Sequence, residues 1–279
     1  MTVGEAIRWV GSSLKVNEIE EADLEAGYMV ANLLERDRNH LHLSYQEKLA
    51  HPDEIALLEM VKRRIKREPV QYIIGECGFL DYIFYVGEGV FIPRPETELL
   101  VLKARDYLLD THSAIVYDIG TGCGVVGLSL AKLIPDLSVY ASDITDLRFA
   151  RMNRKRLGVT KKVCLLAGSL FEPYKALPNA DMIVSNPPYI RTGKIPFLAP
   201  EIRNFEPRES IDGGEDGLSF IKKLTSDAPL YLKPGGILIF EIGDGEWRKA
   251  EKIASIYFNR VSVEIDYNGK ERVCICELD

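Results

Sequence analysis

Four consecutive residues, Asn186-Pro187-Pro188-Tyr189, are the part of this chain best suited to chemistry. They follow an apolar run, residues 182–185, which predicts a buried parallel strand. Asn-Pro favours a turn, and the second proline can neither continue a helix nor donate to a sheet. The strand should therefore end here and present an amide and an aromatic ring in a crevice at the carboxyl edge of the sheet. The alternative is a rigid strand-end turn without chemistry.

This Asn-Pro-Pro-Tyr turn (residues 186–189) suits the recognition of a planar NH₂ group. The side-chain oxygen of Asn186 and the carbonyl of Pro187 can each accept one N–H hydrogen. Pro187 has no N–H of its own to compete, and Tyr189 can stack on the planar group or face a cation. Such a site favours methylation of an amide or an exocyclic amine.

A glycine loop gives a second functional pattern. Gly122-x-Gly124-x-x-Gly127 lies between an apolar strand and a helix, where glycines permit a tight turn and the helix start presents free N–H groups to a negative ligand. Asp143 ends the next predicted strand, where a carboxylate can accept both ribose hydroxyls and exclude a 2′-phosphate. The two features predict a nucleoside cofactor, either NAD or S-adenosylmethionine.

The turn distinguishes between these cofactors. A methyl donor needs a nucleophile held in line with its sulfonium carbon, and the Asn-Pro-Pro-Tyr turn can provide that. A NAD-dependent oxidoreductase would explain the glycine loop but would leave the turn without a role, and no hydride-partner histidine is evident.

The alternation of strands and helices predicts a doubly wound, Rossmann-like parallel α/β sheet that positions both features. Asn268-Gly269, a strong hairpin dipeptide, joins the last two predicted strands, so the sheet should end in an antiparallel edge. The predicted strands are 115–119, 137–142, 162–167, 181–185, 237–242, 260–266 and 272–278.

Two segments precede this sheet. Residues 1–70 predict a small helical accessory domain, in which Thr2-x-x-Glu5 and Ser44-x-x-Glu47 match capping boxes and Asp53 should cap a further helix. Residues 71–92 are rich in aromatic and β-branched residues and are broken by glycines, so they predict a β-hairpin linker. Residues 93–279 form the predicted catalytic domain.

Two further segments have local interpretations. The basic run at residues 62–67 favours a solvated helix end or, alternatively, a contact with RNA or an acidic partner. Pro95 suits the first turn of a helix that should run to about residue 109.

Composition is typical of a soluble globular protein. The 279 residues are 46% hydrophobic, and the formal net charge of −7 argues against a large non-specific nucleic-acid surface. No apolar run reaches the roughly 20 residues of a membrane span, and the first residues show no secretory signal. Five scattered cysteines indicate a reduced, cytoplasmic protein, with Cys274 and Cys276 as buried strand thiols rather than a metal pair. We expect a monomer without a metal site.

The order of motifs along nearly the whole chain is similar to that of a known family. Residues 118–124 resemble motif I of class I S-adenosylmethionine-dependent methyltransferases, and the turn resembles the motif of enzymes that methylate adenine, cytosine or glutamine amino groups. Residues 91–98 and 212–218 narrow the resemblance to the peptide chain release factor glutamine N5-methyltransferase family. In that family the acceptor is the glutamine of the Gly-Gly-Gln tripeptide of class 1 release factors.

The resemblance implies roles for individual residues. Asp143 would hold the ribose of S-adenosylmethionine, Phe91 would cover the cofactor, and Ser169 and Leu170 would meet the adenine edge. Ser169 replaces an acidic residue common at that position, so somewhat weaker cofactor binding is expected. The methionine part of the cofactor would lie against the glycine loop, Gly120, Thr121, Gly122, Cys123 and Gly124.

The same resemblance makes the turn the substrate site. Asn186, Pro187, Pro188 and Tyr189 would bind the glutamine amide, with Asn186, Pro187 and Tyr189 catalytic and Asn186 also close to the cofactor. The predicted reaction is a direct in-line methyl transfer that leaves S-adenosylhomocysteine. An amide nitrogen is a poor nucleophile, so two acceptors on its N–H groups would supply orientation and electrostatic activation.

Three alternatives stay open at this stage. A DNA or RNA amino-group methyltransferase would share the cofactor site and the turn, but its nucleic-acid substrate fits poorly with the acidic net charge. The others are the NAD-dependent oxidoreductase and a non-enzymatic partner-binding protein with a relict cofactor fold.

Overall fold

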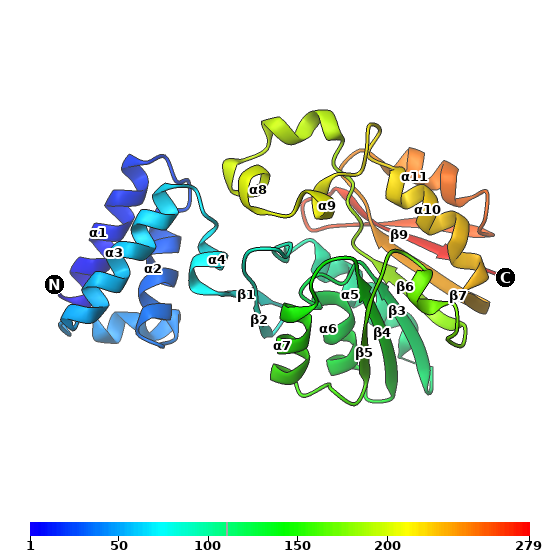
Figure 1. Cartoon of the computed structure of the whole chain (residues 1–279), viewed down its shortest axis with the longest axis horizontal. Helices are drawn as coiled ribbons and strands as arrows, with labels where there is room; N and C mark the ends of the chain where they lie inside the picture. Colours follow the sequence, from blue (N-terminus) through cyan, green and yellow to red (C-terminus); the bar gives the residue numbers. More distant parts are fainter. Residues whose placement is uncertain (110) are drawn as a thin grey trace. The chain divides into compact units, whose positions relative to one another are not determined.

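The computed structural model describes residues 1–109 and 111–279 (Figure 1). The chain divides into two compact units, one formed by Met1–Glu76 with Ala199–Phe205 and the other by Cys77–Leu198 with Glu206–Asp279. The division into three parts at residues 70 and 92 stays a prediction.

The first unit is helical, as expected. It comprises α1 (Val3–Val16), α2 (Ala22–Leu33), a 3₁₀ helix (Arg38–Ser44), α3 (His51–Ile65), α4 (Val70–Ile74) and α8 (Pro200–Phe205). Its core is built around side chains such as Leu14, Met29 and Leu57, which are fully buried. Unpaired helical faces would leave this apolar surface in water, so the helices stabilise one another by burying it.

The capping predictions had mixed outcomes. Thr2 and Glu5 form the predicted capping box at the start of α1. The second box is wrong, because Ser44 ends a 3₁₀ helix and its carbonyl accepts the backbone N–H of Glu47. Asp53 is not a cap either, since α3 begins at His51 and Asp53 lies in its first turn.

The basic run on α3 is folded into an ion-pair network of the helical unit. Arg64 is only 5% exposed, and its guanidinium bonds both oxygens of Glu25, at 2.6 and 3.1 Å, and Glu201 at 2.9 Å. Arg63 pairs with Glu68 at 2.5 Å. A solvated helix end is therefore the wrong interpretation for Arg64, and its buried guanidinium is not presented to RNA.

The second unit is built on a seven-stranded sheet in the order β5-β4-β3-β6-β7-β9-β8. Its strands are β3 (Ala114–Ile119), β4 (Leu137–Asp143), β5 (Val163–Ala167), β6 (Ala180–Ser185), β7 (Leu232–Glu241), β8 (Arg260–Ile265) and β9 (Glu271–Glu277). Strands β3 to β7 pair in parallel, whereas β9 runs antiparallel to both β7 and β8. The predicted doubly wound sheet with an antiparallel C-terminal edge is confirmed.

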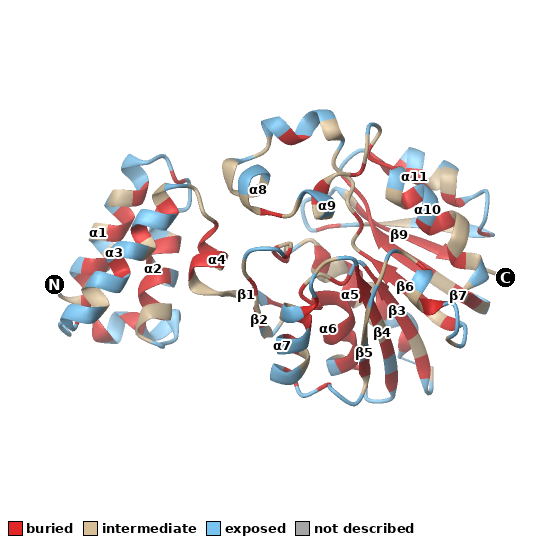
Figure 2. Ribbon diagram, viewed as in Figure 1, coloured by how far each residue is buried: buried red, intermediate tan, exposed pale blue. Residues whose placement is uncertain are grey.

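Helices cover both faces of this sheet. Figure 1 shows α5 (Thr97–Leu108), α6 (Val125–Leu133) and α7 (Arg148–Arg156) on one side and α10 (Ser219–Asp227) and α11 (Trp247–Ala254) on the other. The strands between them are largely buried in Figure 2, as expected for parallel strands with both faces covered. Helix α5 begins two residues beyond Pro95, which instead accepts the backbone N–H of Glu98 in a turn.

The hairpin before the sheet is shorter than predicted. It consists of β1 (Glu76–Phe79) and β2 (Tyr82–Tyr85), while residues expected to be extended form the short helix α4. Pro69 lies at the N-cap of α4, and Gly75, with φ of +78°, ends it. Local β propensity gives way here to a proline start, a left-handed glycine stop and the burial of Val70, Tyr72 and Ile73.

Strand β3 is the point at which the sheet changes direction. The chain runs outward from β3 to β4 and β5, then returns to add β6 on the other side of β3. The carboxyl ends of β3, β4 and β6 therefore lie together at a topological switch point, where open α/β sheets bind ligands.

Across residues 1–109 and 111–279, no helix combines the length and apolarity needed to span a bilayer, and no cluster of three potential metal ligands is present. Cys274 and Cys276 are buried on β9 with their sulfur atoms 3.6 Å apart, as expected for strand thiols.

Candidate functional site

The glycine loop follows β3 and is tied to the neighbouring strand β4. The backbone N–H groups of Gly120 and Thr121 both donate to the carbonyl of Ser142, each at 2.9 Å. Gly124 has φ of +92°, and a Cβ there would lie 2.4 Å from Cδ1 of Leu128. A left-handed backbone and this close approach together require glycine at position 124.

A buried carboxylate beneath the loop fixes its shape. Oδ2 of Asp118 accepts the hydroxyl of Thr121 at 2.6 Å and the backbone N–H of Gly127 at 2.9 Å. Burial raises the pKa of Asp118 to about 6 from 3.8, although these two bonds oppose the shift. Oδ1 of Asp118 has no hydrogen-bond partner within the described chain. The sequence singled out Asp118 only as part of a motif and gave it no role.

Asp143, at the end of β4, joins the loop to the predicted ribose position. Its Oδ2 accepts the backbone N–H of Gly122 at 2.8 Å, and its Oδ1 accepts the backbone N–H and the hydroxyl of Thr145 at 2.9 and 2.7 Å. A carboxylate offers about four acceptor positions, so these three donors leave room for one ribose hydroxyl while the Thr145 hydroxyl stays in place. A bond to the second hydroxyl would require the Thr145 hydroxyl to turn away.

The remaining predicted cofactor residues lie on segments around the same edge. Ser169 is exposed after β5, and Leu170 beside it is half-buried with φ of +47°. Phe91 is half-buried, with the Arg94 guanidinium 4.8 Å from its ring centroid. Cys123 is buried and burial raises the pKa of its thiol, so it is a neutral packing group there.

Two observations support a fit for a nucleoside at this edge. A Cβ on Gly120 would meet no heavy atom of the described chain within 4 Å, so the loop backbone is open on that side. Ile144 is 63% exposed directly after Asp143 and offers apolar surface beside that carboxylate. Ile144 was not among the residues predicted from the sequence, although an apolar residue directly after a strand-ending carboxylate is a visible pattern.

Asn153 of α7 connects the glycine loop to the β1–β2 hairpin. Its Nδ2 donates to the carbonyls of Cys123 at 2.9 Å and Tyr85 at 3.0 Å, and its Oδ1 accepts the backbone N–H of Tyr85 at 2.7 Å. The Asn153 side chain is completely buried, and its bond to Cys123 is shielded from water. The hairpin is thereby held against the loop by one side chain, a role for which the sequence offered no pattern.

The Asn-Pro-Pro-Tyr turn follows β6, the strand next to β3. Pro187 is buried, whereas Asn186 and Tyr189 are half-buried. Nδ2 of Asn186 donates to the hydroxyl oxygen of Thr97 at 3.0 Å. The turn thus follows its strand as the sequence predicted, and the bond to Thr97 places it beside the start of α5, which the sequence did not predict.

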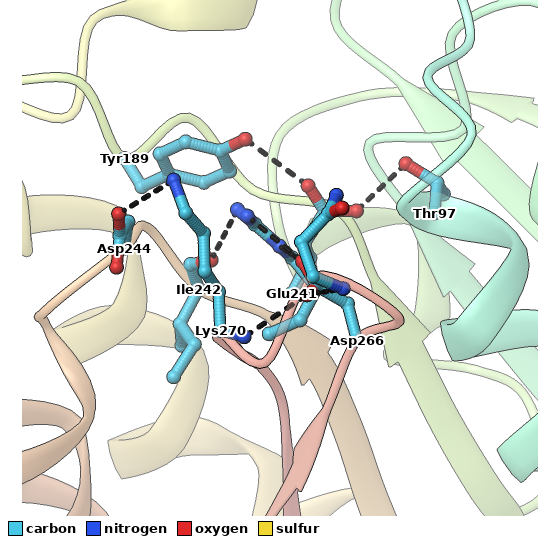
Figure 3. A network of polar contacts seen from close by, with 9 residues as sticks. Thr97, Tyr189, Glu241, Ile242, Asp244, Asp266 and Lys270 are labelled. Atoms are coloured by element: carbon cyan, nitrogen blue, oxygen red, sulfur yellow. Dashed lines mark hydrogen bonds and ion pairs between the residues drawn. The ribbon is translucent and has the colours of Figure 1, made fainter.

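Glu241, the last residue of β7, is hydrogen-bonded to the turn and to its neighbour Thr97. It accepts the hydroxyl of Thr97 at 2.7 Å through Oε2 and the hydroxyl of Tyr189 at 3.1 Å through Oε1, and Figure 3 shows it between these two residues. Burial raises the pKa values of Glu241 and of the Tyr189 hydroxyl, so Tyr189 stays a neutral donor. Thr97 and Glu241 were part of recognised motifs, but their contact with the turn could not be read from the sequence.

A second glycine-rich segment, residues 213–217, packs against the backbone of the turn. Gly213 donates its N–H to the carbonyl of Ile190 at 2.8 Å, and a Cβ on Gly213 would lie 2.9 Å from the carbonyl oxygen of Pro188. A Cβ on Gly217 would lie 2.6 Å from the carbonyl oxygen of Tyr189. The glycines of this segment therefore allow two backbones to meet without side chains between them.

Arg94, from the segment before α5, forms an ion pair with the buried carboxylate of Glu206. Burial raises the pKa of Glu206, and the positive charge of Arg94 opposes that shift. The pair connects the segment at residues 91–98 to the chain that follows α8.

The sequence-predicted residues thus gather at one edge of the sheet. The glycine loop, Asp143, Ser169 and the turn follow β3, β4, β5 and β6, and the close approach of Val90 to Gly122 brings the Phe91 segment to the loop. The edge combines a loop open to a nucleoside, a carboxylate with spare acceptor capacity and an amide whose oxygen is free of the Thr97 contact.

Known protein domains match both units of the chain. Residues 5–75 match the PrmC N-terminal domain, and residues 96–200 match the methyltransferase small domain.

Two solved structures share the fold. One is the 16S rRNA N2 G1207 methyltransferase of T. thermophilus in complex with AdoMet and guanosine, with a TM-score of 0.54 and 21% identity over 73% of this chain and 50% of that chain. The other is the hMettl16 catalytic domain in complex with an RNA hairpin, with a TM-score of 0.56 and 14% identity over 82% of each chain. At these identities the likeness shows the fold alone.

Bacterial release factor glutamine methyltransferases are similar over nearly the full length. The protein of Thermodesulfovibrio yellowstonii is 36% identical over 94% of this chain and 95% of its own. That of Geobacter sulfurreducens is 38% identical over 98% and 95%, and that of Bacillus anthracis is 33% identical over all of both chains. These identities extend across the helical unit and the sheet together, and the chain therefore belongs to the release factor glutamine methyltransferase family.

Proposed function

We propose that this enzyme transfers a methyl group from S-adenosylmethionine to the side-chain amide nitrogen of a glutamine in a class 1 peptide chain release factor. The acceptor would be the glutamine of the Gly-Gly-Gln tripeptide. The observation that carries the proposal is the adjacency of β3 and β6, which sets the Asn-Pro-Pro-Tyr turn next to the glycine loop and Asp143. Family membership supports the choice of a protein glutamine over a nucleobase.

Different residues would contact different parts of the cofactor. Asp143 would accept a ribose hydroxyl, residues 120–124 would lie along the methionine part, and Ile144, Ser169 and Leu170 would border the adenine. Phe91, carried by the segment next to Gly122, would cover the cofactor. When bound, S-adenosylmethionine supplies a methyl group on a positively charged sulfur.

The turn would prepare the acceptor nitrogen. Oδ1 of Asn186 and the carbonyl of Pro187 would each accept one N–H of the glutamine amide, which fixes the nitrogen in the plane and direction needed for in-line attack. The partial negative charges of these two oxygen acceptors also stabilise the transition state, in which the amide nitrogen becomes positive. Pro188 and Tyr189 would enclose the amide plane.

The transfer balances without a strong base in the turn. As the nitrogen–carbon bond forms and the carbon–sulfur bond breaks, the positive charge moves to the amide nitrogen, which then releases a proton to solvent. The methylated glutamine and S-adenosylhomocysteine leave as products. A monomer acting in the cytoplasm, where translation ends, is consistent with this role.

The test uses the full chain, S-adenosylmethionine with a labelled methyl group and three acceptors in parallel. These are a class 1 release factor, the same factor with the Gly-Gly-Gln glutamine changed to alanine, and mixed DNA and RNA. We expect label on the intact factor only. Label on nucleic acid alone would overturn the acceptor, and equal label on both factors would overturn the choice of residue.

The nucleic-acid alternative would use the same fold, which this chain shares with two RNA-bound or nucleoside-bound methyltransferases. Their low identity shows only the fold, and the acidic net charge of −7 opposes a phosphate-binding surface. We therefore expect no stable retention of the chain on nucleic acid at physiological salt.

A further inference from the structure

We propose that Thr97 and Glu241 are positioning residues that fix which way the side-chain amide of Asn186 points. The inference deepens the proposed function and rests on it, because it concerns how the turn meets the substrate amide. Thr97 is the first residue of α5 and Glu241 is the last residue of β7, and each is only 1% exposed. Neither is in the Asn-Pro-Pro-Tyr turn itself.

The single hydroxyl hydrogen of Thr97 determines which groups donate and which accept in the bonds that link Asn186, Thr97 and Glu241. A threonine hydroxyl carries one hydrogen. Both oxygens of Glu241 are occupied as acceptors, Oε2 by the Thr97 hydroxyl and Oε1 by the Tyr189 hydroxyl, so the carboxyl group donates to neither. The hydroxyl donates its hydrogen to Oε2 of Glu241 at 2.7 Å, so towards Asn186 the same oxygen can only accept. The atom of Asn186 that lies 3.0 Å from it must therefore be a donor, which is Nδ2.

The bond to Thr97 fixes which end of the Asn186 side-chain amide is the nitrogen and which is the oxygen. The oxygen and nitrogen of an asparagine amide are nearly isosteric, and their assignment depends on the surrounding bonds. With Nδ2 held by Thr97, Oδ1 must point to the opposite side of the amide. Oδ1 is then the atom that accepts a hydrogen bond from the substrate amide. In a reversed Asn186 amide, the Nδ2 hydrogens would face the N–H groups of the substrate, and no hydrogen bond could form.

The same carboxylate also holds the far end of the turn. The hydroxyl of Tyr189 donates to Oε1 of Glu241 at 3.1 Å, on the side away from Thr97 (Figure 3). One buried side chain is therefore bonded to Tyr189 directly and to Asn186 through Thr97. The two residues that must be placed relative to one amide plane thus share one anchor. Losing the Thr97 hydroxyl should release Asn186 while leaving Tyr189 anchored.

The first experiment compares methyl transfer by three variants with that of the wild type, at saturating S-adenosylmethionine and with a release factor as acceptor. Thr97→Val keeps the shape and removes the hydroxyl, and we expect kcat to fall about tenfold, which corresponds to one hydrogen bond of ordinary net strength. Thr97→Ser keeps the hydroxyl and should stay within about threefold of wild type. Cofactor affinity, measured by calorimetry, should change little in both.

Thr225→Val is the matched control. Thr225 is also completely buried, but its hydroxyl donates to the carbonyl of Ile221 within α10. This variant suffers the same change of a buried hydroxyl to a methyl group and should retain wild-type kcat. The proposal is overturned if Thr97→Val keeps more than half of wild-type kcat or if Thr97→Ser is equally impaired.

A second experiment needs neither cofactor nor acceptor. The ¹⁵N side-chain amide signal of Asn186 is assigned by its loss in Asn186→Ala, and its position is then compared in Thr97→Val and Thr97→Ser. We expect the valine variant to shift this signal and the serine variant to leave it close to wild type. An unmoved signal in Thr97→Val would overturn the proposal, even if the enzyme proved to have another acceptor.

The outcomes distinguish failure of the positioning role from failure of the proposed function. If Thr97→Val shifts the Asn186 amide signal but the wild type does not methylate the release factor, the proposed function is wrong and the positioning role is supported. If Thr97→Val does not fold, the wild type alone still tests the bond. Its Asn186 amide hydrogens should exchange with water at least about tenfold more slowly than those of exposed Asn268, and equal rates would overturn the proposal.

Discussion

Nδ2 of Asn186 lies 3.0 Å from the hydroxyl oxygen of Thr97, although 89 residues separate them in the sequence. The bond joins the end of β6 to the first residue of α5. The residue expected to meet the substrate is therefore held by a different element from the one that carries it, and this separation makes its role testable by substitution.

Replacing Asn186 with alanine removes one of the two acceptors for the substrate amide. We expect methylation of the release factor to be lost, with kcat reduced well beyond the tenfold that corresponds to about 1.4 kcal/mol of barrier. Cofactor affinity should stay nearly intact, because the glycine loop and Asp143 are untouched. The measurement pairs single-turnover kinetics with calorimetry, and a variant that retains more than a tenth of wild-type kcat contradicts the role.

Changing Asp143 to asparagine should act on the cofactor instead. Asparagine offers one acceptor oxygen where the carboxylate offers two, so either Gly122 or Thr145 loses its partner and the ribose loses a charge-assisted bond. Such a bond contributes about 1.5–3 kcal/mol, which predicts a rise of at least about tenfold in the Kd of S-adenosylmethionine.

Asp146→Asn is the control for that change. Asp146 lies in the same connection but is exposed and accepts the backbone N–H of Arg148 at 3.0 Å. Its variant should bind S-adenosylmethionine within about twofold of wild type, since the ion pair of Asp146 with Arg151 is exposed and exposed pairs contribute little. Equal loss in the two variants would show that Asp143 has no special part in binding.

Gly213→Ala should disturb the turn through its backbone. The added Cβ would lie 2.7 Å from the carbonyl oxygen of Gly217 and 2.9 Å from that of Pro188, and neither backbone can move aside cheaply. We expect a loss of about 1–3 kcal/mol in the free energy of unfolding and a lower kcat. Gly193→Ala tests the same exchange where a Cβ meets no described heavy atom within 4 Å, and it should be neutral in both assays.

Asp118 makes stability depend on pH. Its pKa is raised by burial to about 6, above the ordinary 3.8, so the folded state binds the proton more tightly than the unfolded state. The resulting stabilisation is complete below pH 3.8 and is lost as the pH rises through 6.

Asp118→Asn removes this titration. Between pH 5 and 7.5, the unfolding free energy of the wild type should fall by about 1.4 kcal/mol relative to the variant. Other carboxylates with raised pKa values, such as Glu206 and Glu241, titrate in both proteins and cancel in the comparison. Urea unfolding of both proteins across this range checks the slope, and parallel pH profiles would show that Asp118 does not titrate there.

The sheet was predictable because its residues repeat one simple pattern. Apolar runs of strand length alternate with helical segments, and each parallel strand ends at a polar or glycine-containing turn such as Asp143 or Asn186. Local patterns were less reliable in the helical unit. The Ser44-x-x-Glu47 pattern did not start a helix, and residues 70–74 became helical because Pro69 and Gly75 bound them.

The site was predictable only as far as motifs reach. The residues of the glycine loop and the turn can be recognised by their type and spacing. The residues that hold these segments in place through hydrogen bonds cannot. Asn153 is 68 residues from Tyr85, and Glu241 is 52 residues from Tyr189, so each contact exists only after the sheet has formed. A threonine at a helix start or a glutamate at a strand end is common, and the direction of its bonds depends on partners that come from other elements.

The bond between Arg64 and Glu201 bears on how this protein can be divided experimentally. Glu201 lies in Ala199–Phe205, the short segment that belongs to the helical unit although it begins ten positions after the Asn-Pro-Pro-Tyr turn (residues 186–189). The polypeptide therefore passes between the units three times, after residues 76, 198 and 205. A truncated enzyme that starts at residue 77 would keep Glu201 while losing its arginine partners Arg64 and Arg67. A separable catalytic fragment therefore has to be cut at all three boundaries, with residues 1–76 removed and residues 199–205 replaced by a neutral linker.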